Sequence, residues 1–413
     1  MTTSIWGHYD TLLADLDGVV YEGKNAIEPA PSVINQFQRD GVKVGYVTNN
    51  SSRSPETVAE QLRGFGVETT ADQVIGSAQA GVELLATLIP AGSKVLVVGG
   101  DGLREAVTDA GFALVSSSDD EPAGVIQGFA PDVAWNHLAE ASYAIQRGAK
   151  WVATNQDWTI PREKGMAPGN GTLVSAVHTA VGILPPVAGK PEPAIFHTAL
   201  RELGATKALF VGDRIDTDIS GANRAGIDSA VVMTGVATRK ELLGLKPENR
   251  PVYILADMSD LTRAYPTPKA TKHGYKCGKS LVELLGNKVR VIDGDPGSID
   301  SLRAACAVIY NAELPIYALD VEPAELRAGK TLRQLEEAFL QVDVLAGEGG
   351  DVVAVEHLPD ERLDARLNLL LRVGVDRGRA AQRAYGRGHG RNLPGTRRGG
   401  RGLLERTQLA LGQ

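Results

Sequence analysis

Short apolar segments that stop at polar residues alternate with segments of helical spacing along the first 265 residues of the chain. TLLADLD at 11–17 and VKVGYVTNN at 42–50 are apolar runs of strand length, and PSVINQFQRDG at 31–41 lies between them with helical spacing and a closing glycine. Strands that alternate with helices in this way indicate a parallel sheet covered by helices. We therefore predict an α/β fold whose core is a Rossmann-like parallel sheet.

The alternation continues in two further stretches. A helix is expected to begin at Ser54-Pro55-Glu56, which combines a capping residue, a proline in the first turn and an acid near the positive helix end. Residues 75–185 could bury a core of their own, and the first pattern resumes after them. In the inserted stretch we expect a strand, turn and helix over 94–112, strands at 123–129 and 150–157, helices at 135–148 and 172–182, and a loop at 161–171. After it we expect helices at 193–204 and 219–226 and strands at 207–213 and 228–235.

The last third of the chain changes character. YPTPKATKHG at 265–274 is typical of a linker, because it is rich in Pro, Thr and Lys. Strand and helix patterns then alternate through about residue 373, in KVRVIDGD, SLRAACAVIYNA, LPIYALD, AELRAGKTLRQLEEAFLQ, DVVAVEH and ERLDARLNLLLRVG. From Arg377 to Gly402 the chain is an Arg/Gly mixture without periodicity, which predicts a disordered tail.

Composition excludes several classes of protein. The 413 residues are enough for two or three domains, and 43% hydrophobic residues are enough for sizeable cores. A net charge of -7 argues against a protein that coats nucleic acid. Two distant cysteines, Cys277 and Cys306, exclude a disulfide framework and a zinc cluster. The chain has no apolar run near the roughly 20 residues of a membrane span and no signal-peptide pattern, so we expect a cytoplasmic enzyme.

Four polar clusters follow four of the expected strands. They are Asp15 with Asp17, Thr48 with Asn49, Lys190 in VAGKPEP, and Asp213 in LFVGDRIDTD. Ligands bind outside the carboxyl ends of the strands in a parallel sheet, so we expect these clusters to converge on one pocket.

These residue types suit phosphoryl transfer. Gathered carboxylates repel one another unless a cation is present, and Mg²⁺ prefers oxygen ligands of this kind. A carboxylate fixed at a strand end can act as nucleophile, and a second one two residues later can move the proton of the leaving oxygen. The hydroxyl of Thr48 and the ammonium of Lys190 can hold the phosphoryl oxygens.

The motifs resemble those of a known family. DLDGVVYEG, VTNNSSR, GKPEP and GDRIDTDI are similar, in this order, to the four motifs of haloacid dehalogenase-superfamily phosphatases. The resemblance is to class IIA, the NagD-like group that includes 4-nitrophenylphosphatases, phosphoglycolate phosphatases and glycerol-3-phosphate phosphatases. The long gap lies between Thr48 and Lys190, where this class carries its α/β cap, and TNQDWTIPREKGMAPGNG resembles the cap loop of the family. The resemblance covers about residues 8–265.

The resemblance implies a Rossmann-like core with an inserted cap of the C2 type. We accordingly assign 1–74 and 186–265 to the catalytic core, 75–185 to the cap, 275–373 to a small C-terminal α/β module of unknown role, and 374–413 to the tail.

It also implies a role for each motif residue. Asp15 would be the nucleophile and a Mg²⁺ ligand, and Asp17 the general acid and base, with its backbone carbonyl on the metal. Asp213 would be the third metal ligand, and Asp218 would support the site from behind. Thr48 and Asn49 would contact the phosphoryl group, and Lys190 would neutralise it.

Several residues have more than one interpretation. Gly18 serves a turn or allows close approach to a phosphate. Asn155 and Asp157 either line the substrate surface of the cap or form a turn, and Asp216 is interpreted as a surface or helix-capping residue rather than a ligand. The Arg/Gly tail could contact RNA, but it has few aromatic residues to stack bases, and we expect no nucleic-acid partner.

The expected function is Mg²⁺-dependent hydrolysis of a small phosphate monoester through an aspartyl phosphate, with glycerol 3-phosphate as the first candidate substrate. Phosphoglycolate, nucleoside monophosphates and 4-nitrophenyl phosphate are alternatives, as is a phosphotransferase. A different class of function, ligand sensing or regulation through the C-terminal module, stays open. The resemblance also makes a homodimer through the cap an expectation.

Overall fold

The computed structural model describes residues 5–162 and 164–327. Expectations for later residues, including most of the helix at AELRAGKTLRQLEEAFLQ and the Arg/Gly tail, lie outside the described residues. Among the residues described, no helix has both the length and the apolar character needed to cross a membrane.

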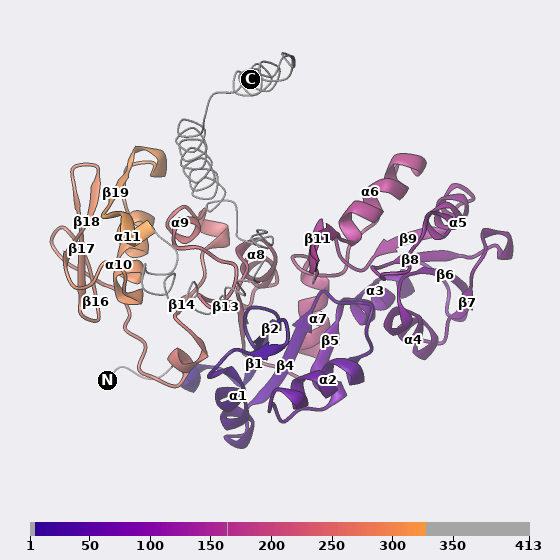
Figure 1. The fold of residues 1–413 in the computed structure, drawn as a ribbon, viewed down its shortest axis with the longest axis horizontal. Coiled ribbons are helices and arrows are strands. Elements are labelled where there is room, and N and C mark those ends of the chain that lie inside the picture. Colours follow the sequence, from indigo (N-terminus) through magenta and orange to yellow (C-terminus); the bar gives the residue numbers. More distant parts are fainter. Residues whose placement is uncertain (1–4, 163, 328–413) are drawn as a thin grey trace, which may run out of the picture. The chain divides into compact units, whose positions relative to one another are not determined.

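A six-stranded parallel sheet forms the core, as the alternating pattern predicts (Figure 1). In spatial order its strands are β14 (Tyr253–Leu255), β13 (Asp228–Val232), β12 (Ala208–Gly212), β1 (Thr11–Ala14), β4 (Lys43–Thr48) and β5 (Val74–Gly76). Its helices are α1 (Ala30–Arg39), α2 (Pro55–Gly64), α7 (Pro193–Glu202), α8 (Ser220–Arg224) and α9 (Arg239–Leu243). The short pair β2 (Tyr21–Glu22) and β3 (Asn25–Ala26) follows β1.

Both faces of this sheet are covered. Leu12 packs in a cluster with residues of α1 and α2, whereas Leu13 packs in another cluster with residues of α7 and α8. Successive side chains of a strand point to opposite faces, so a strand buried on both sides is apolar throughout. This explains why TLLA carries no polar/apolar alternation although it is the central strand.

The segment between β5 and α7 forms a second parallel sheet with helices of its own (Figure 1). Its strands, in spatial order, are β7 (Ala113–Val115), β6 (Lys94–Val98), β8 (Gly124–Gln127) and β9 (Lys150–Ala153). One hydrophobic cluster joins it to α3 (Ser77–Ala86) and α4 (Asp101–Asp109), and another joins it to α5 (Trp135–Gln146) and α6 (Asn170–Val181).

The loop expected at 161–171 is wrong. The chain forms an antiparallel hairpin there, with β10 (Thr159–Arg162) paired to β11 (Gly165–Pro168), and α6 begins at Asn170. Pro161 and Pro168 hide the strand pattern in the sequence, because proline is excluded from the interior of a sheet. A two-stranded ribbon has two open edges, where the missing N–H of a proline is tolerated.

The C-terminal module is a five-stranded sheet with one long helix packed on it. In spatial order its strands are β15 (Lys269–Ala270), β16 (Gly274–Cys277), β17 (Ser280–Leu285), β18 (Lys288–Asp293) and β19 (Asp320–Glu322), and its helices are α10 (Ile299–Tyr310) and α11 (Ala324–Arg327). The linker expected at 265–274 is therefore in part an edge strand. LPIYALD, expected within the strand and helix alternation, is a 3-10 turn that leads into β19.

Arg303 of α10 connects this module to the core sheet. It is 3% exposed, donates from Nε to the carbonyl of Ile254 (2.8 Å), and pairs with Asp260 (2.8 Å) and Asp300 (3.1 Å). Its guanidinium also lies 4.5 Å from the ring centre of Tyr265. A buried cation with a full set of partners fixes the two parts to each other.

We expect Arg303→Ala to lower the free energy of unfolding by about 3–5 kcal/mol, because it leaves the carboxylates of Asp260 and Asp300 without their buried partner. Chemical denaturation of the full chain measures this. Arg290→Ala is the matched control, since Arg290 pairs with Glu322 at the surface and its loss should change stability little. Equal stability of the two variants would contradict the role of Arg303.

Candidate active site

Asp15 directly follows β1, at the carboxyl end of the core sheet. Its Oδ1 lies 2.6 Å from Nζ of Lys190. Lys190 lies between α6 of the inserted segment and α7 of the core. The same Nζ lies 2.7 Å from Oδ1 of Asp218. Lys190 is 4% exposed, so its ammonium has been taken out of water and placed between two carboxylates.

Asp213 completes a cluster of three buried acids. Oxygens of Asp15, Asp213 and Asp218 all lie within 4.8 Å of one another. Asp213 follows β12, which pairs with β1, and its Oδ2 accepts a hydrogen bond from the backbone N–H of Val236 (2.7 Å). Oδ2 of Asp218 accepts from the backbone N–H groups of Asp213 (3.2 Å) and Arg214 (3.0 Å), which fixes the loop that carries Asp213.

Gly18 permits this arrangement. It has φ +79°, a conformation that L side chains rarely adopt, and a Cβ at this position would lie 2.3 Å from Oδ2 of Asp213. The turn interpretation therefore applies to Gly18, and the group that it approaches closely is the carboxylate of Asp213. The close approach to a phosphate stays a prediction.

Burial dominates the electrostatics of the acids. It raises the pKa of Asp15 to about 8, against the opposing effect of Lys190, and the charges of Asp218 and Asp213 add to the rise. Burial and the charge of Asp218 raise the pKa of Asp213 to about 7. Burial alone would lower the pKa of Lys190, but Asp15 and Asp218 outweigh it and raise that pKa above its ordinary value. Ionisation of all three buried acids is therefore unfavourable when Lys190 is the cation beside them.

This charge imbalance is the test of whether a metal fits. Three carboxylates face one ammonium among the ion pairs of the described residues, which leaves two negative charges when all three acids are ionised. A divalent cation with oxygen ligands matches both that charge and the donor set. The residues present therefore fit Mg²⁺, as the sequence predicts.

We expect Mg²⁺ to stabilise the protein more at about pH 8.5 than at about pH 6. Without metal, the raised pKa values of Asp15 and Asp213 favour the folded state at low pH, and this contribution is lost as the pH rises from about 4 to about 8. Mg²⁺ binds the ionised acids, so its affinity should weaken below pH 7 by about tenfold per pH unit for each proton displaced.

Thermal unfolding in EDTA and in excess Mg²⁺, at both pH values, measures this effect. Asp213→Asn removes one titrating carboxylate and should reduce the Mg²⁺-dependent shift. A shift of equal size at the two pH values would contradict the acid cluster as the binding site.

Asp17 lies outside the three-acid cluster and is more exposed. Partial burial raises its pKa, while the hydroxyl of Tyr21 and the charges of Arg53 and Lys190 act in the opposite direction. A carboxyl group whose pKa is raised can donate a proton near neutral pH.

Two neighbours of Asp17, Tyr21 and Arg53, were not identified from the sequence. Arg53 stands at the end of the motif VTNNSSR, and this position is the signal that could have identified Arg53.

Thr48 ends β4, and its Oγ1 accepts a hydrogen bond from the backbone N–H of Asn50 (3.1 Å). The side chain of Asn49 brackets the peptide of Lys190: its Oδ1 accepts from the N–H of Lys190 (2.7 Å), and its Nδ2 donates to the carbonyl of Lys190 (3.0 Å). The expected phosphoryl contact of Asn49 stays a prediction, because the structure places its amide on Lys190.

Asn155 and Asp157 differ from each other in what they contact. Asn155 is 4% exposed, donates to the carbonyl of Asn49 (2.8 Å) and accepts from the N–H of Asp157 (3.2 Å), as an Asx turn does. Asp157 is partly exposed, and its carboxylate accepts from Nδ2 of Asn49 at 3.2 and 3.3 Å. The turn interpretation therefore applies to Asn155, and the interpretation of Asp157 as part of the substrate surface stays a prediction.

Arg214 is a further charged residue that the sequence did not identify, although it directly follows Asp213. Its guanidinium forms a two-point pair with Asp216, Nε to Oδ1 at 3.1 Å and Nη2 to Oδ2 at 2.7 Å. Asp216 is 65% exposed at its side chain, in agreement with its interpretation as a surface residue.

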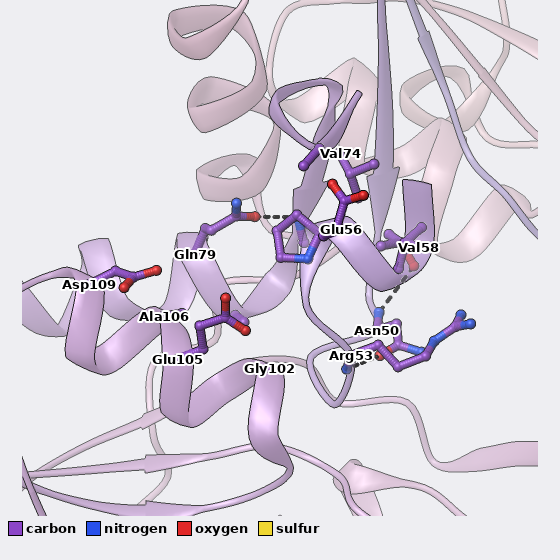
Figure 2. Close-up of a pocket in the computed structure, with 15 residues that line it drawn as sticks. Asn50, Arg53, Glu56, Val58, Val74, Gln79, Gly102, Glu105, Ala106 and Asp109 are labelled. Carbon is purple, nitrogen blue, oxygen red and sulfur yellow. Dashed lines mark hydrogen bonds between the residues drawn. The ribbon is translucent and has the colours of Figure 1, made fainter. Parts of the chain in front are cut away.

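A cavity of about 200 Å³ opens between α2 and α4, and Thr48 and Arg53 are among the residues that line it. Figure 2 shows Glu56, Glu105 and Asp109 around it, with Gln79 hydrogen-bonded to the backbone N–H of Gly76 (2.7 Å). Three carboxylates against the one guanidinium of Arg53 disfavour a phosphate ester, so the residues around Lys190 remain the better candidate site.

The expectation that Lys190 follows a strand is wrong, because Lys190 precedes α7 and the nearby Val187 forms only an isolated bridge to β9. Buried acids after β1 and β12, a buried lysine before α7 and an α/β insertion indicate an enzyme of the Rossmann-like α/β class. Comparison with known proteins makes the assignment specific. Residues 12–113 match the family model of haloacid dehalogenase-like hydrolases, and residues 187–261 match a second, HAD-hydrolase-like model. The chain therefore belongs to the haloacid dehalogenase-like hydrolases, as its motifs predict.

Characterised relatives support this assignment. The chain is 42% identical over 258 residues to a D-glycerol 3-phosphate phosphatase of Mycobacterium tuberculosis, covering 62% of this chain and 72% of that protein. It is 38% identical over 259 residues to an acid sugar phosphatase of Staphylococcus saprophyticus, covering 62% and 98%. A crystal structure of a Mycobacterium tuberculosis glycerol phosphate phosphatase in complex with magnesium matches with a TM-score of 0.70 and 37% identity, covering 79% of this chain and 97% of that one.

Proposed function

We propose that the protein is a Mg²⁺-dependent phosphatase that hydrolyses a small phosphate monoester through an aspartyl phosphate. One observation carries the proposal: the buried ammonium of Lys190 holds the carboxylate of Asp15 at 2.6 Å, beside Asp213 and Asp218. A carboxylate fixed at a strand end and flanked by positive charge can attack a phosphorus atom that the same charge attracts.

The proposed reaction has two steps. An oxygen of Asp15 attacks phosphorus, the bond from phosphorus to the alcohol oxygen breaks, and Asp17 gives that oxygen its proton. Asp17 then takes a proton from water, which attacks phosphorus and releases inorganic phosphate and free Asp15. Lys190 and Thr48 hold the phosphoryl oxygens. Mg²⁺, held by Asp15, Asp213 and the backbone carbonyl of Asp17, would offset the negative charge of the phosphoryl group.

Glycerol 3-phosphate is the proposed substrate. The support is the 42% identity to the D-glycerol 3-phosphate phosphatase, which exceeds the identity to the acid sugar phosphatase. Phosphoglycolate, nucleoside monophosphates and 4-nitrophenyl phosphate are the alternatives within the same chemistry. Regulation through the C-terminal module has no observation that favours it.

The domain boundaries belong to the same proposal: 1–74 and 186–265 as the core, 75–185 as the cap and 275–373 as the C-terminal module. The homodimer through the cap, the cytoplasmic location and the absence of a nucleic-acid partner stay predictions.

A phosphate-release screen tests the function. The full chain with Mg²⁺ is given glycerol 3-phosphate, phosphoglycolate, a nucleoside monophosphate and 4-nitrophenyl phosphate. We expect release from several esters, with the highest kcat/KM for glycerol 3-phosphate. Absence of release from every ester would overturn the function, and a higher kcat/KM for another ester would overturn the substrate alone.

A further inference from the structure

We propose that the C-terminal module positions the carboxylate of Asp213, and that Arg239 of α9 is the positioning residue that connects the two. The inference rests on the proposed phosphatase function, which makes Asp213 a ligand of Mg²⁺. It gives the C-terminal module a part in the metal site that needs no ligand of its own.

The segment that follows β13 lies against Asp213. The backbone N–H of Val236 donates to Oδ2 of Asp213 (2.7 Å), and the N–H of Ala237 donates to the carbonyl of Asp213 (2.8 Å). A Cβ at Gly235 would lie 2.0 Å from the same Oδ2, so the backbone of this segment directly contacts the carboxylate. The direction in which the carboxylate of Asp213 points therefore depends on where residues 235–237 lie.

α9 continues from this segment, and the C-terminal module binds its first residue. Arg239 donates from Nη1 to the carbonyl of Ser298 (3.3 Å) and from Nη2 to the carbonyl of Gly297. Both carbonyls stand directly before α10 of the module. Thr238 alone separates Arg239 from Ala237, so a displacement of Arg239 also moves the backbone that contacts Asp213.

A shared hydrophobic cluster holds the same region. It includes side chains of the segment around α9, of α10 and of the loop after Asp213, namely Ala237, Leu242, Leu302, Ile309, Ile215 and Ile219. Along the chain, Ile215 and Ile219 stand on either side of Asp218, whose carboxylate contacts Lys190. Because a close-packed cluster transmits displacements, the module supports the segments that carry both acids.

The Mg²⁺ affinity of Arg239→Ala tests this support. Removal of a group that orients a metal ligand typically weakens metal binding by about 10–100-fold, and we expect about tenfold here because Arg239 acts through the backbone. Calorimetric titration of the full chain with Mg²⁺, without substrate, measures the affinity. At saturating Mg²⁺ the kcat should stay close to that of the wild type, because Asp15 and Lys190 are unchanged. Arg239→Lys keeps a cationic donor and should restore most of the affinity.

Arg290→Ala is the matched control. It removes another arginine of the module, one that pairs with Glu322 at the surface, and should leave the Mg²⁺ affinity unchanged. If Arg239→Ala is unfolded at the titration temperature, Tyr310→Phe decides the question. Tyr310 of α10 donates its hydroxyl to the carbonyl of Leu242 in α9 (2.5 Å), so its loss should weaken Mg²⁺ binding in the same direction, and an unchanged affinity would overturn the inference.

The outcomes separate this inference from the proposed function. Equal Mg²⁺ affinity of Arg239→Ala and the wild type, in a protein that releases phosphate, would overturn the inference and leave the phosphatase function standing. An equal weakening in Arg290→Ala would overturn the inference as well. A wild type that binds Mg²⁺ but releases phosphate from no ester would overturn the function, and the affinities would then still decide the role of Arg239. A wild type that does not bind Mg²⁺ would overturn both.

Discussion

Phosphate release falls by about 10⁴-fold or more when Asp15 is replaced by Asn, because an amide cannot form the covalent phosphoryl intermediate. The folded protein should survive this change well. Burial and the charges of Asp218 and Asp213 raise the pKa of Asp15 to about 8, so its ionised form is disfavoured without Mg²⁺ and a neutral isostere avoids that cost. We expect the melting temperature of Asp15→Asn without Mg²⁺ to equal or exceed that of the wild type. Steady-state release of inorganic phosphate and thermal unfolding, measured on the same preparation, test both parts.

Asp40→Asn provides the control for this experiment. Asp40 caps the end of α1 and is exposed, so the same chemical change there should alter neither turnover nor stability. Turnover of Asp15→Asn at the wild-type rate would refute the nucleophile. A large loss of stability in that variant would instead refute the electrostatic account of the cluster.

Lys190→Ala should damage both folding and turnover. Lys190 is the cation that contacts both Asp15 and Asp218 within the described cluster, at 2.6 and 2.7 Å. Its removal leaves buried acids unpaired, which should cost about 3–5 kcal/mol of unfolding free energy without Mg²⁺. Loss of a phosphoryl-binding charge should also lower kcat by about 10²–10³-fold. Denaturant unfolding with and without Mg²⁺, and phosphate release at saturating Mg²⁺, measure the two effects.

Lys150→Ala is the control for Lys190→Ala, because the expected losses of stability and turnover depend on the burial of Lys190. Lys150→Ala removes an exposed ammonium at the start of β9 and should have little effect on either measurement. If the two lysine variants unfold at the same denaturant concentration, the buried ion pairs do not contribute as the structure indicates.

The sequence predicted the α/β layers well, because the strands buried on both faces are short apolar runs between helical segments. It failed where strands lack that signal. The hairpin of β10 and β11 contains prolines, and β16 and β17 are consecutive antiparallel strands in a stretch that appeared to follow a linker. Antiparallel neighbours need no helix between them, so the alternation that identifies parallel strands is missing there.

The sequence by itself determined that Asp15, Thr48 and Asp213 stand at the carboxyl ends of strands, because apolar runs of strand length end at these residues. The motifs also led to the expectation that these residues and Lys190 share one pocket, but only the tertiary structure decided which of their atoms are in contact. Lys190 and Asp218 reach Asp15 because β1 pairs with β12 and because Asn49 fixes the backbone of Lys190. Burial, which no single residue specifies, raises the pKa values of Asp15 and Asp213. Three-dimensional contacts also place Arg53 beside Asp17 and bring Asp157 to Asn49, since these contacts join segments that are separated along the chain.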